Sequence, residues 1–463
     1  MPDANVVIIG GGVSGLSAGY FLSQLGIRST LIEKSPRLGG LIKTDVIEKC
    51  LLEAGPDSFI AAKPAVTELA QELIDLRDQI IGSNDERRRI FVVRGGKLVA
   101  MPRGMVMMAP GQWMPTLRSP LFSIQTKLRF FTETFSKPVE RLNDVSVAEF
   151  VRDHFGNEVL QYVAEPLLSG VYGGDSAHLS AQSVLPRFIE YERKYGSLIR
   201  GVRHQIQRTP PHSSIFLSFR DGMQTLTDTL AHAAAPHMQV IHAEASRVER
   251  SATGWLIDAG DQRVEADRLI LACPAYACAR LLEHTAPSLA TELGAIRYSS
   301  AILVNLVYER SRLEHPLNGF GFLVPRGERR TVAAATWSST KFSNRVPPRL
   351  AALRAFIVEP EATELLKAPK ETLVGAVRTE FATIMGIDAS PLLSTVQPWP
   401  QSMPQYDVGH QQRCERIFQL TAECPDLHLT GNAYQGVGIP DCIRMAKETA
   451  KEVARGIGAE QFS

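Results

Sequence analysis

The sequence predicts an α/β protein in which one parallel-sheet domain, built from separate parts of the chain, is joined by an α+β domain and an inserted helical domain. Three observations predict this organisation. Residues 6–33 have the pattern of a strand, a glycine-rich turn, a helix and a second strand, which is how a Rossmann-like domain begins. Strand patterns vanish over residues 102–214, where helical patterns dominate, and return afterwards. A second glycine-rich turn at residues 436–441 opens the last helix, so the two ends of the chain are expected to complete one domain.

The N-terminal turn has the spacing of a phosphate-binding loop. Val6–Ile9 are four consecutive β-branched residues, as in a parallel strand buried on both faces. Gly10, Gly12 and Gly15 follow at the G-x-G-x-x-G spacing. The first glycine allows the tight turn, the second lets a pyrophosphate approach the backbone, and the third lets the helix lie close to the strand. The pyrophosphate is expected at the helix N-terminus, where free N–H groups point at it.

Glu33 and the residues after it indicate which dinucleotide is bound. Glu33 ends the second strand, where a carboxylate would accept both ribose hydroxyls of an adenosine. An ordinary glycine-rich turn, the alternative interpretation, would leave this acid a coincidence. Arg37-Leu38-Gly39-Gly40 follows, and it adds a second glycine pair and a cation beside the phosphates. A nicotinamide-binding domain has no evident need of that pair.

With these residues the chain resembles the flavoproteins that hold FAD through G-x-G-x-x-G, a distal glutamate and an R-x-G-G segment. That group includes amine oxidases, carotenoid desaturases and porphyrinogen oxidases. The resemblance implies FAD as the cofactor.

Composition and charge argue against several other classes of protein. With 463 residues, the chain is long enough for two or three domains, and 44% apolar and 21% charged residues are typical of a globular protein. The formal charge of +1 gives no signal for nucleic acid. The six cysteines contain no C-x-x-C pair, which favours reduced thiols, and no metal site is expected. The start of the chain has no basic region and no apolar run is long enough to cross a membrane, so a cytoplasmic protein is expected.

The predicted domain boundaries follow the changes in pattern. Strand patterns at 90–93 and 98–101 predict a hairpin, and those at 301–307 and 352–358 predict the antiparallel sheet of a substrate domain. The strands that return between 239 and 272 are expected to extend the first sheet. The predicted FAD-binding domain comprises residues 1–86, 215–274 and 396–463, the substrate domain residues 87–101 and 275–395, and the helical domain residues 102–214.

The stretch from Arg87 to Arg129 contains nine basic residues and no acidic one, interleaved with methionine and other apolar residues. Four prolines within it prevent one long helix. Two interpretations stay open. In the first, the apolar residues pack inward and the basic residues are solvated. In the second, the segment forms a basic, apolar rim that admits a hydrophobic anionic substrate or rests on anionic lipid at the inner face of the membrane. Further along, residues 208–214 predict a mobile loop.

The C-terminal glycine turn indicates the flavin end of the cofactor. Gly436 and Gly438 permit close backbone approach, and Pro440 suits a first helical turn. A helix N-terminus aimed at the N1–C2=O edge of an isoalloxazine would stabilise the anion formed when the flavin accepts a hydride. The alternative is a plain capped helix.

Longer segments make the resemblance more specific. Residues 166–175, 402–410 and 436–443, together with 55–59 and 320–325, are similar to signatures of the oxygen-dependent porphyrinogen oxidases of haem synthesis and occur in the family's order. The resemblance implies three two-electron oxidations of a porphyrinogen, each delivering hydride from a ring methylene carbon to flavin N5. O₂ then reoxidises the flavin and gives hydrogen peroxide. Ring N–H protons can leave to solvent, so no catalytic residue is expected.

The residues expected to bind FAD are Gly10, Gly12, Val13, Ser14, Gly15, Glu33, Lys34, Arg37, Gly39, Gly40, Gly55, Pro56, Asp57, Ser58, Val248, Gly431, Gly436, Val437, Gly438 and Ile439. Substrate contacts are expected from Arg89, Leu168 and Gly170; at the family's propionate-binding position this chain has Ile90 instead of an arginine. The sequence leaves open whether the tetrapyrrole is coproporphyrinogen III or protoporphyrinogen IX, and whether the chain forms a homodimer. The alternatives are an amine oxidase or carotenoid desaturase on the same scaffold, or an FAD-stabilised assembly protein without enzymatic activity.

Overall fold

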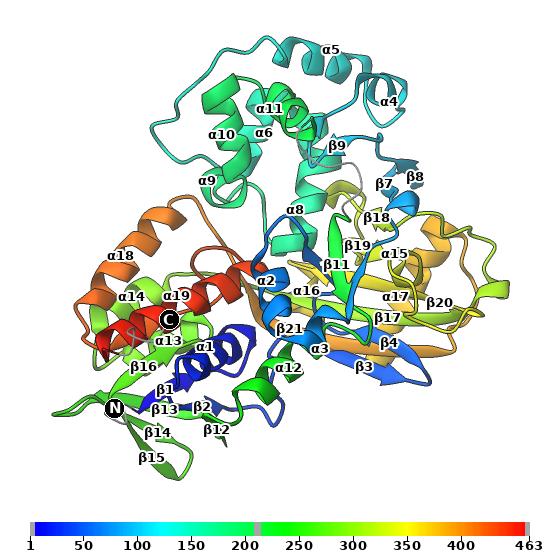
Figure 1. Ribbon diagram of the computed structural model, residues 1–463. Coiled ribbons are helices and arrows are strands. Elements are labelled where there is room, and N and C mark those ends of the chain that lie inside the picture. The colour runs from blue at the N-terminus through cyan, green and yellow to red at the C-terminus, as the bar shows by residue number, and fades with distance from the viewer. Residues whose placement is uncertain (1–4, 208–213, 459–463) are drawn as a thin grey trace.

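The computed structural model describes residues 5–207 and 214–458, and it contains a parallel sheet, a larger mixed sheet and a helical lobe that lies above them in Figure 1. The loop predicted at 208–214 lies outside the described residues, apart from Ser214. The parallel sheet has the strand order β12-β2-β1-β16-β22. Its strands are β1 (Val6–Ile9), β2 (Ser29–Glu33), β12 (Met238–His242), β16 (Arg268–Leu271) and β22 (Leu427–Leu429). One sheet therefore takes strands from three distant parts of the chain, and the predicted fold class is confirmed.

The β-branched run in β1 is explained by burial on both faces of this sheet. Val6 and Ile8 pack into a core with α1 and α19 on one face, and Val7 and Ile9 pack into a second core with α13, α14 and α18 on the other. These helices are α1 (Val13–Gln24), α13 (Ala275–Leu282), α14 (Pro287–Gly294), α18 (His410–Ala422) and α19 (Ile439–Gly456). A continuous apolar strand is what such a central position requires.

The expectation that all returning strands extend the first sheet is wrong for three of them. Only β12 and β16 join it, whereas β13 (Ala245–Arg250), β14 (Trp255–Ala259) and β15 (Gln262–Ala266) form a separate antiparallel sheet. The physical reason is the length of their connections. Two to four residues can join only antiparallel neighbours, because a parallel pair needs a long crossover.

The mixed sheet has the order β21-β17-β20-β19-β18-β7-β8 and includes the hairpin predicted near residue 90. Its strands are β7 (Ile90–Arg94), β8 (Lys97–Ala100), β17 (Tyr298–Glu309), β18 (Gly321–Leu323), β19 (Ala334–Thr336), β20 (Leu350–Val358) and β21 (Leu393–Pro404). Helix α17 (Lys370–Met385) packs against β17 and β21, and α15 (Ser338–Lys341) against β20. The division into domains stays a prediction, and its boundary between 395 and 396 falls within β21.

The helical lobe is built around a core of its own. Its elements are α4 (Trp113–Arg118), α5 (Ile124–Glu133), α6 (Val147–Phe155), α7 (Asn157–Val159), a π-helical turn (Leu160–Ala164), α8 (Glu165–Tyr172), α9 (Ala181–Val184), α10 (Pro186–Tyr195) and α11 (Leu198–Ile206). A short ribbon of β9 (Met105–Val106) and β10 (Ala109–Pro110) interrupts the region in which no strand was expected. None of the helices in the described residues is long and apolar enough to span a membrane.

Smaller elements join the two sheets. They are β3 (Thr44–Ile47), β4 (Cys50–Glu53), β5 (Phe59–Ile60), α2 (Ala65–Glu72), α3 (Ile74–Arg77), β6 (Ile80–Gly82), β11 (Phe216–Phe219), α12 (Gln224–Ala234) and α16 (Glu361–Leu365). The hairpin of β3 and β4 leads directly into the segment 55–58, which is hydrogen-bonded to Arg354 of the mixed sheet.

Candidate active site

The N-terminal glycine turn connects β1 to α1 as expected. Gly10 has φ +111°, and a Cβ there would lie 2.9 Å from backbone atoms of Ala272 and Cys273. A Cβ on Gly15 would lie 1.9 Å from the Gly10 carbonyl oxygen, so α1 packs directly on the turn. Gly12 faces open space, because no atom of another segment lies within 4 Å of a Cβ built there. This space at a helix N-terminus fits a phosphate group.

Glu33 lies at the end of β2 with its carboxylate beside the turn. The Gly11 N–H donates to Oε2 at 2.6 Å, and the Ser35 N–H donates to Oε1 at 2.7 Å. Each carboxylate oxygen can accept a further hydrogen bond, so the geometry fits a pair of ribose hydroxyls. The neighbouring Lys34 is exposed. The cofactor contacts of both residues stay predictions.

The second glycine pair packs on the first, and Arg37 holds it there. The Gly39 N–H donates to the Gly11 carbonyl at 2.8 Å, and Gly40 has a left-handed φ of +57°. The Arg37 guanidinium donates to three backbone carbonyls of residues 38–42. Arg37 therefore fixes the loop in this structure, and its expected contact with the phosphates stays a prediction.

The segment Gly55–Ser58 faces a buried charge cluster. Lys341 Nζ lies 2.9 and 3.0 Å from the two carboxylate oxygens of Asp57 and 3.0 Å from Ser58 Oγ. Arg354 lies 3.4 Å from Asp57 and donates to the Gly55 carbonyl at 2.8 Å. Burial acts to raise the pKa of Asp57, but the charges of Lys341 and Arg354 outweigh it and hold that pKa below its usual value. Asp57 thus ties the segment 55–58 to α15 and to β20 of the mixed sheet.

The C-terminal glycine turn is held by a tyrosine from the end of the mixed sheet. Gly431 and Gly436 have φ of +144° and +129°, and a Cβ on Gly436 would lie 2.5 Å from Asp441 Cγ. The Tyr406 hydroxyl accepts from the Gly436 N–H at 2.9 Å and donates to the Asn432 carbonyl at 2.7 Å. One phenol therefore closes the turn on itself.

The two glycine turns lie next to each other, because the helices that follow them pack together. Helix α19 begins at Ile439 after Gly438 and packs along α1, with Cys442 of α19 and Ser14 of α1 both buried. Burial raises the pKa of the Cys442 thiol to about 11. The predicted residues Val13 and Val437 belong to the same two turns. Two helix N-termini therefore converge on one region, as an extended dinucleotide with a pyrophosphate and a flavin requires.

The end of α8 reaches the C-terminal turn. The Tyr172 carbonyl accepts from Gln405 Nε2 at 2.7 Å and from Ser299 Oγ at 3.2 Å. Burial, together with the charge of Asp441, raises the pKa of the Tyr172 phenol to about 12. The segment 166–175 of the helical lobe is therefore anchored to Gln405 and Ser299, and the Tyr172 ring lies 6.0 Å from the ring of Tyr406, which holds the C-terminal turn.

The residues expected to contact the substrate, and Val248, differ from one another in burial. Leu168 is buried in α8, whereas Gly170 on the same helix is exposed, with open space where a Cβ would be. Arg89 is exposed just before β7. Val248, expected near the adenine, is buried in β13 and its carbonyl accepts from the Thr285 hydroxyl at 2.7 Å. The functional contacts of these residues stay predictions.

Sequence reasoning missed Tyr406, Tyr172 and Lys341 as parts of this region. The segments that contain both tyrosines were singled out, but nothing in their spacing shows which side chain turns toward Gly436 or Asp441. Lys341 had one local signal, which is its place four residues after Trp337 and directly before Phe342, both fully buried. A lysine within such a run has to be paired when it is buried.

Comparison with known protein families gives a match over most of the chain. The profile described as "Flavin containing amine oxidoreductase" matches residues 13–454, which includes the first helix and the C-terminal turn. The chain belongs to the flavin-containing amine oxidoreductase family. Membership in this family confirms the expected flavin cofactor, FAD, for which the open space at Gly12 and the converging helices are suited.

Named relatives align with this chain over nearly its whole length. It is 30% identical to a coproporphyrinogen III oxidase of Staphylococcus aureus, with 97% of this chain and 98% of that protein aligned. It is also 30% identical to the human protoporphyrinogen oxidase, again over 97% of this chain and 98% of the relative. Among solved structures, a putative protoporphyrinogen oxidase from Exiguobacterium superposes with a TM-score of 0.87 at 27% identity and covers 98% of this chain and 100% of that one. Cyclohexylamine oxidase from Brevibacterium oxydans, at 15% identity over 99% of this chain and 100% of its own with a TM-score of 0.70, shares the fold.

Proposed function

We propose that this flavoprotein is an oxygen-dependent porphyrinogen oxidase of haem synthesis. It removes six electrons from coproporphyrinogen III or protoporphyrinogen IX, passes them to O₂ and forms hydrogen peroxide. The observation that carries the proposal is the meeting of the 166–175 segment with the C-terminal turn: the Tyr172 ring lies 6.0 Å from the ring of Tyr406, whose hydroxyl accepts from the Gly436 N–H. Full-length similarity to relatives with both names supports it.

The chain's own residues bind and orient rather than transfer protons. FAD supplies a two-electron acceptor for each of three oxidations when it is bound between the two turns. The N-terminus of α19 directs the positive end of its dipole at the turn where negative charge develops. Tyr406 keeps that turn closed, and the buried pair of Asp57 and Lys341 fixes the segment 55–58. Positioning of this kind suffices because a porphyrinogen is electron-rich and loses its N–H protons readily.

Anaerobic mixing with each substrate tests the proposal. We expect coproporphyrinogen III or protoporphyrinogen IX to bleach the flavin absorbance, and porphyrin fluorescence and peroxide to appear when air is admitted. Bleaching by an amine but by neither porphyrinogen would overturn the assignment. The substrate that bleaches faster decides between the two tetrapyrroles.

A pair of glycine variants tests whether Gly170 borders the substrate. Gly170 in α8 and Gly375 in α17 are both exposed helical glycines with open space where a Cβ would be. Each can therefore take a leucine at similar cost to folding. We expect Gly170→Leu to lower porphyrinogen kcat/KM at least about tenfold with FAD retained, because the side chain fills the open space at Gly170 that the proposal gives to the substrate. Gly375→Leu is the control and should match the wild type; equal activity of both variants would remove Gly170 from the site.

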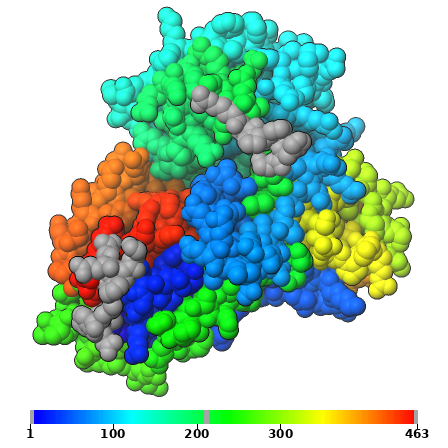
Figure 2. All heavy atoms as spheres, viewed as in Figure 1, coloured from blue at the N-terminus to red at the C-terminus, as the bar shows by residue number. Residues whose placement is uncertain are grey.

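The outer surface of the helical lobe supports a second proposal, peripheral contact with an anionic membrane. Ile124, Leu128 and Phe131 lie on one face of α5 and are 77, 62 and 57% exposed, and Leu142 beyond it is 92% exposed. These residues belong to the part of the chain coloured cyan, which forms the outer end of the lobe (Figures 1 and 2). Monomeric soluble proteins rarely leave such a contiguous apolar face uncovered.

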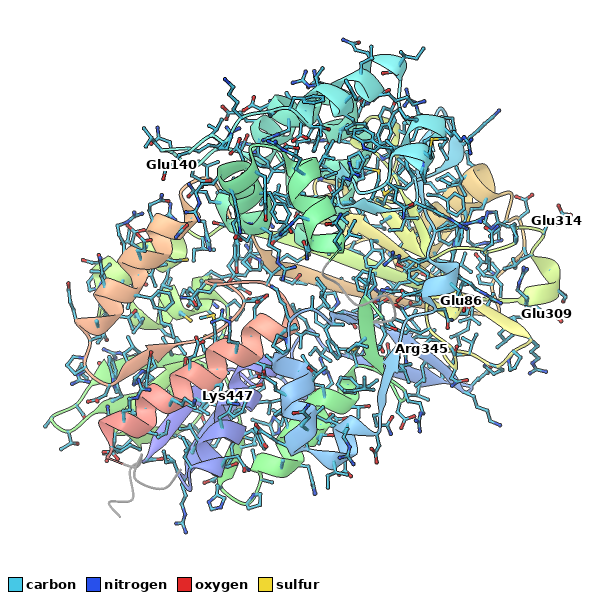
Figure 3. The ribbon with its side chains drawn as sticks, turned by 45° about the horizontal axis from the view of Figure 1, so that its top comes forward. Glu86, Glu140, Glu309, Glu314, Arg345 and Lys447 are labelled. Carbon is cyan, nitrogen blue, oxygen red and sulfur yellow. The ribbon has the colours of Figure 1, made fainter. Side chains whose placement is uncertain are left out.

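Charge favours a lipid surface as the occupant of this face. Arg118 and Lys137 are exposed beside it, and Lys127 is half-buried on α5 itself. The exposed acid Glu140 lies on the loop that follows, at the edge of the lobe in Figure 3. An apolar face with basic flanks is typical of helices that lie in the interface of an anionic bilayer. A cytoplasmic enzyme would then work at the inner face of the membrane.

Flotation with vesicles separates the possible occupants. We expect binding to phosphatidylglycerol-containing vesicles, weaker binding to neutral vesicles, and loss of binding in Leu128→Glu. Leu392→Glu is the matched control, because Leu392 is 60% exposed in a distant loop and Leu128 is 62% exposed. Light scattering at the same protein concentration tests the homodimer. A dimer that Leu128→Glu dissociates, without any vesicle binding, would assign the face to a second copy instead.

A further inference from the structure

Two cysteines meet beside the N-terminal glycine turn. Cys273 follows β16, and Cys278 lies in the first turns of α13. Their Sγ atoms are 3.4 Å apart, and the Cys278 thiol also lies 3.4 Å from the Cys273 carbonyl oxygen. A disulfide bond is about 2.05 Å long, so the two sulfurs have to approach by about 1.4 Å, a distance that side-chain rotation can supply.

The two thiols differ in access. Cys278 is fully buried, whereas Cys273 is partly exposed. The hydrogen bond to Cys273, followed by burial, raises the pKa of the Cys278 thiol well above its usual value. Cys273 is therefore the sulfur that a small oxidant reaches, and Cys278 is the protonated partner held behind it.

The pair lies between the two turns that hold the cofactor. On one side, the Cys273 N and the adjoining Ala272 backbone are the atoms that a Cβ on Gly10 would meet at 2.9 Å. On the other side, Cys278 packs in the same buried core as Tyr434, a residue of the C-terminal glycine turn. Tyr434 is fixed there by its carbonyl, which accepts from His410 Nε2 at 3.1 Å. Any movement of the pair is therefore transmitted to both turns.

We propose that Cys273 and Cys278 form a reversible disulfide when the protein meets hydrogen peroxide, and that this modification loosens FAD. The Cys273 thiolate attacks one peroxide oxygen, the O–O bond breaks, and Cys273 sulfenic acid and hydroxide form. The Cys278 sulfur then attacks the Cys273 sulfur, the S–O bond breaks, and the departing hydroxide takes the Cys278 proton. In total, two thiols and one peroxide give one disulfide and two waters, counting the protons of both thiols.

The source of the oxidant links the pair to the chemistry of the site. The proposed oxidase reaction forms peroxide within the same protein that contains Cys273. That link rests on the proposed function, whereas the disulfide itself does not, because added peroxide tests it without any substrate. Drawing the sulfurs together changes the backbone that supports Gly10 and the packing of Tyr434. Strain in a ligand-binding segment lowers the affinity for the ligand, here FAD.

Mass spectrometry of the oxidised holoenzyme tests the proposal. Reduced FAD-loaded protein is treated with stepwise equivalents of hydrogen peroxide, and the remaining thiols are alkylated before tryptic digestion. We expect the peptide 269–280, which contains both cysteines, to escape alkylation and to lose two hydrogen atoms, and dithiothreitol to restore it. Cys424 is the internal control, because it is also partly exposed but has no cysteine partner and should stay alkylated.

FAD release, followed by the rise in flavin fluorescence, is the second readout. We expect oxidation to speed release by about an order of magnitude in the wild type and to leave the release rates of Cys273→Ser and Cys278→Ser unchanged. The Cys424→Ser variant should respond like the wild type. Three results would each overturn the inference: a pair that stays reduced, sulfinic acid at Cys273 without a disulfide, or a disulfide that forms without faster FAD release. None of these depends on which porphyrinogen is the substrate.

Discussion

Removal of Lys341 is the sharpest test of how the segment 55–58 is joined to α15 and the mixed sheet. In Lys341→Met the Asp57 carboxylate loses a cation at 2.9 Å and keeps only Arg354 at 3.4 Å. The gross attraction of two charges 3 Å apart at an effective dielectric of 20 is about 5 kcal/mol. Part of this is returned because the lysine no longer has to be desolvated, and Arg354 compensates for another part. We therefore expect the free energy of unfolding to fall by about 3 kcal/mol, at the lower end of what broken buried pairs cost.

A double-mutant cycle with Asp57→Asn measures this interaction in urea unfolding followed by circular dichroism and flavin fluorescence. The coupling energy between Asp57 and Lys341 should be about 3 kcal/mol at neutral pH. Lys447→Met is the matched control, because Lys447 lies 3.5 Å from Glu72 with both side chains about two-fifths exposed. Figure 3 labels Lys447, which lies on α19, and Arg345, a buried arginine 4.0 Å from Glu53. The control should lose less than about 1 kcal/mol.

The pH dependence of the same cycle follows from the direction of the Asp57 pKa shift. Because the folded-state pKa lies below the unfolded value of about 3.9, the stabilisation is complete above that value and is lost as the pH falls through the folded pKa. The difference between wild type and Lys341→Met should therefore be constant from pH 6 to 8 and shrink only in strong acid. A coupling energy below about 0.5 kcal/mol at pH 7, the level of surface pairs, would refute the reasoning.

Three further predictions concern the turns and the helical lobe. Gly15→Ala should weaken FAD binding by about tenfold to a hundredfold in a fluorescence titration, because its Cβ would lie 1.9 Å from the Gly10 carbonyl oxygen; unchanged affinity would show that the turn yields. Tyr406→Phe should retain the fold but release FAD about tenfold more easily, since it loses two hydrogen bonds to the C-terminal turn, and equal retention would separate the phenol from the cofactor. Burial acts to lower the pKa of His154, but hydrogen bonds to two buried glutamates raise it, so its stabilisation is complete below the unfolded pKa and is lost as the pH rises through the folded one. Thermal unfolding should show this loss on the alkaline side in the wild type but not in His154→Gln; parallel profiles would contradict it.

The parts of the site that the sequence predicted are those in which local spacing is sufficient. A side chain at Gly15 would collide with Gly10 in the same turn, and one at Gly10 would collide with the backbone that follows the adjacent strand. The position of Glu33 beside the turn is set by the length of one helix and one strand. The C-terminal turn could be predicted for the same reason, because α19 starts within three residues of Gly436. In each case a short motif determines its own conformation.

Contacts across the molecule could not be predicted in this way. Asp57 and Lys341 are 284 residues apart, and nothing in the sequence around either residue indicates that the two form a pair. Arg37 shows the converse limit. Its position beside two glycines indicated a phosphate contact, which stays a prediction, and nothing in the sequence indicates that its donors also bind carbonyl groups of the loop. The backbone path that brings those carbonyls to the guanidinium is not visible in the local sequence.

The apolar stretch before residue 143 shows why two interpretations stayed open from the sequence. Met108 is fully buried in the core of the helical lobe, whereas Met114 is 55% exposed. The change occurs at α4, where the chain leaves the short ribbon and where Met114 and Leu117 are largely exposed. Hydrophobic spacing shows that a helix has an apolar face but not whether another element covers it. The uncovered face of α5 is therefore a property of the tertiary arrangement, and vesicle binding by the wild type but not by Leu128→Glu is the measurement that gives it a function.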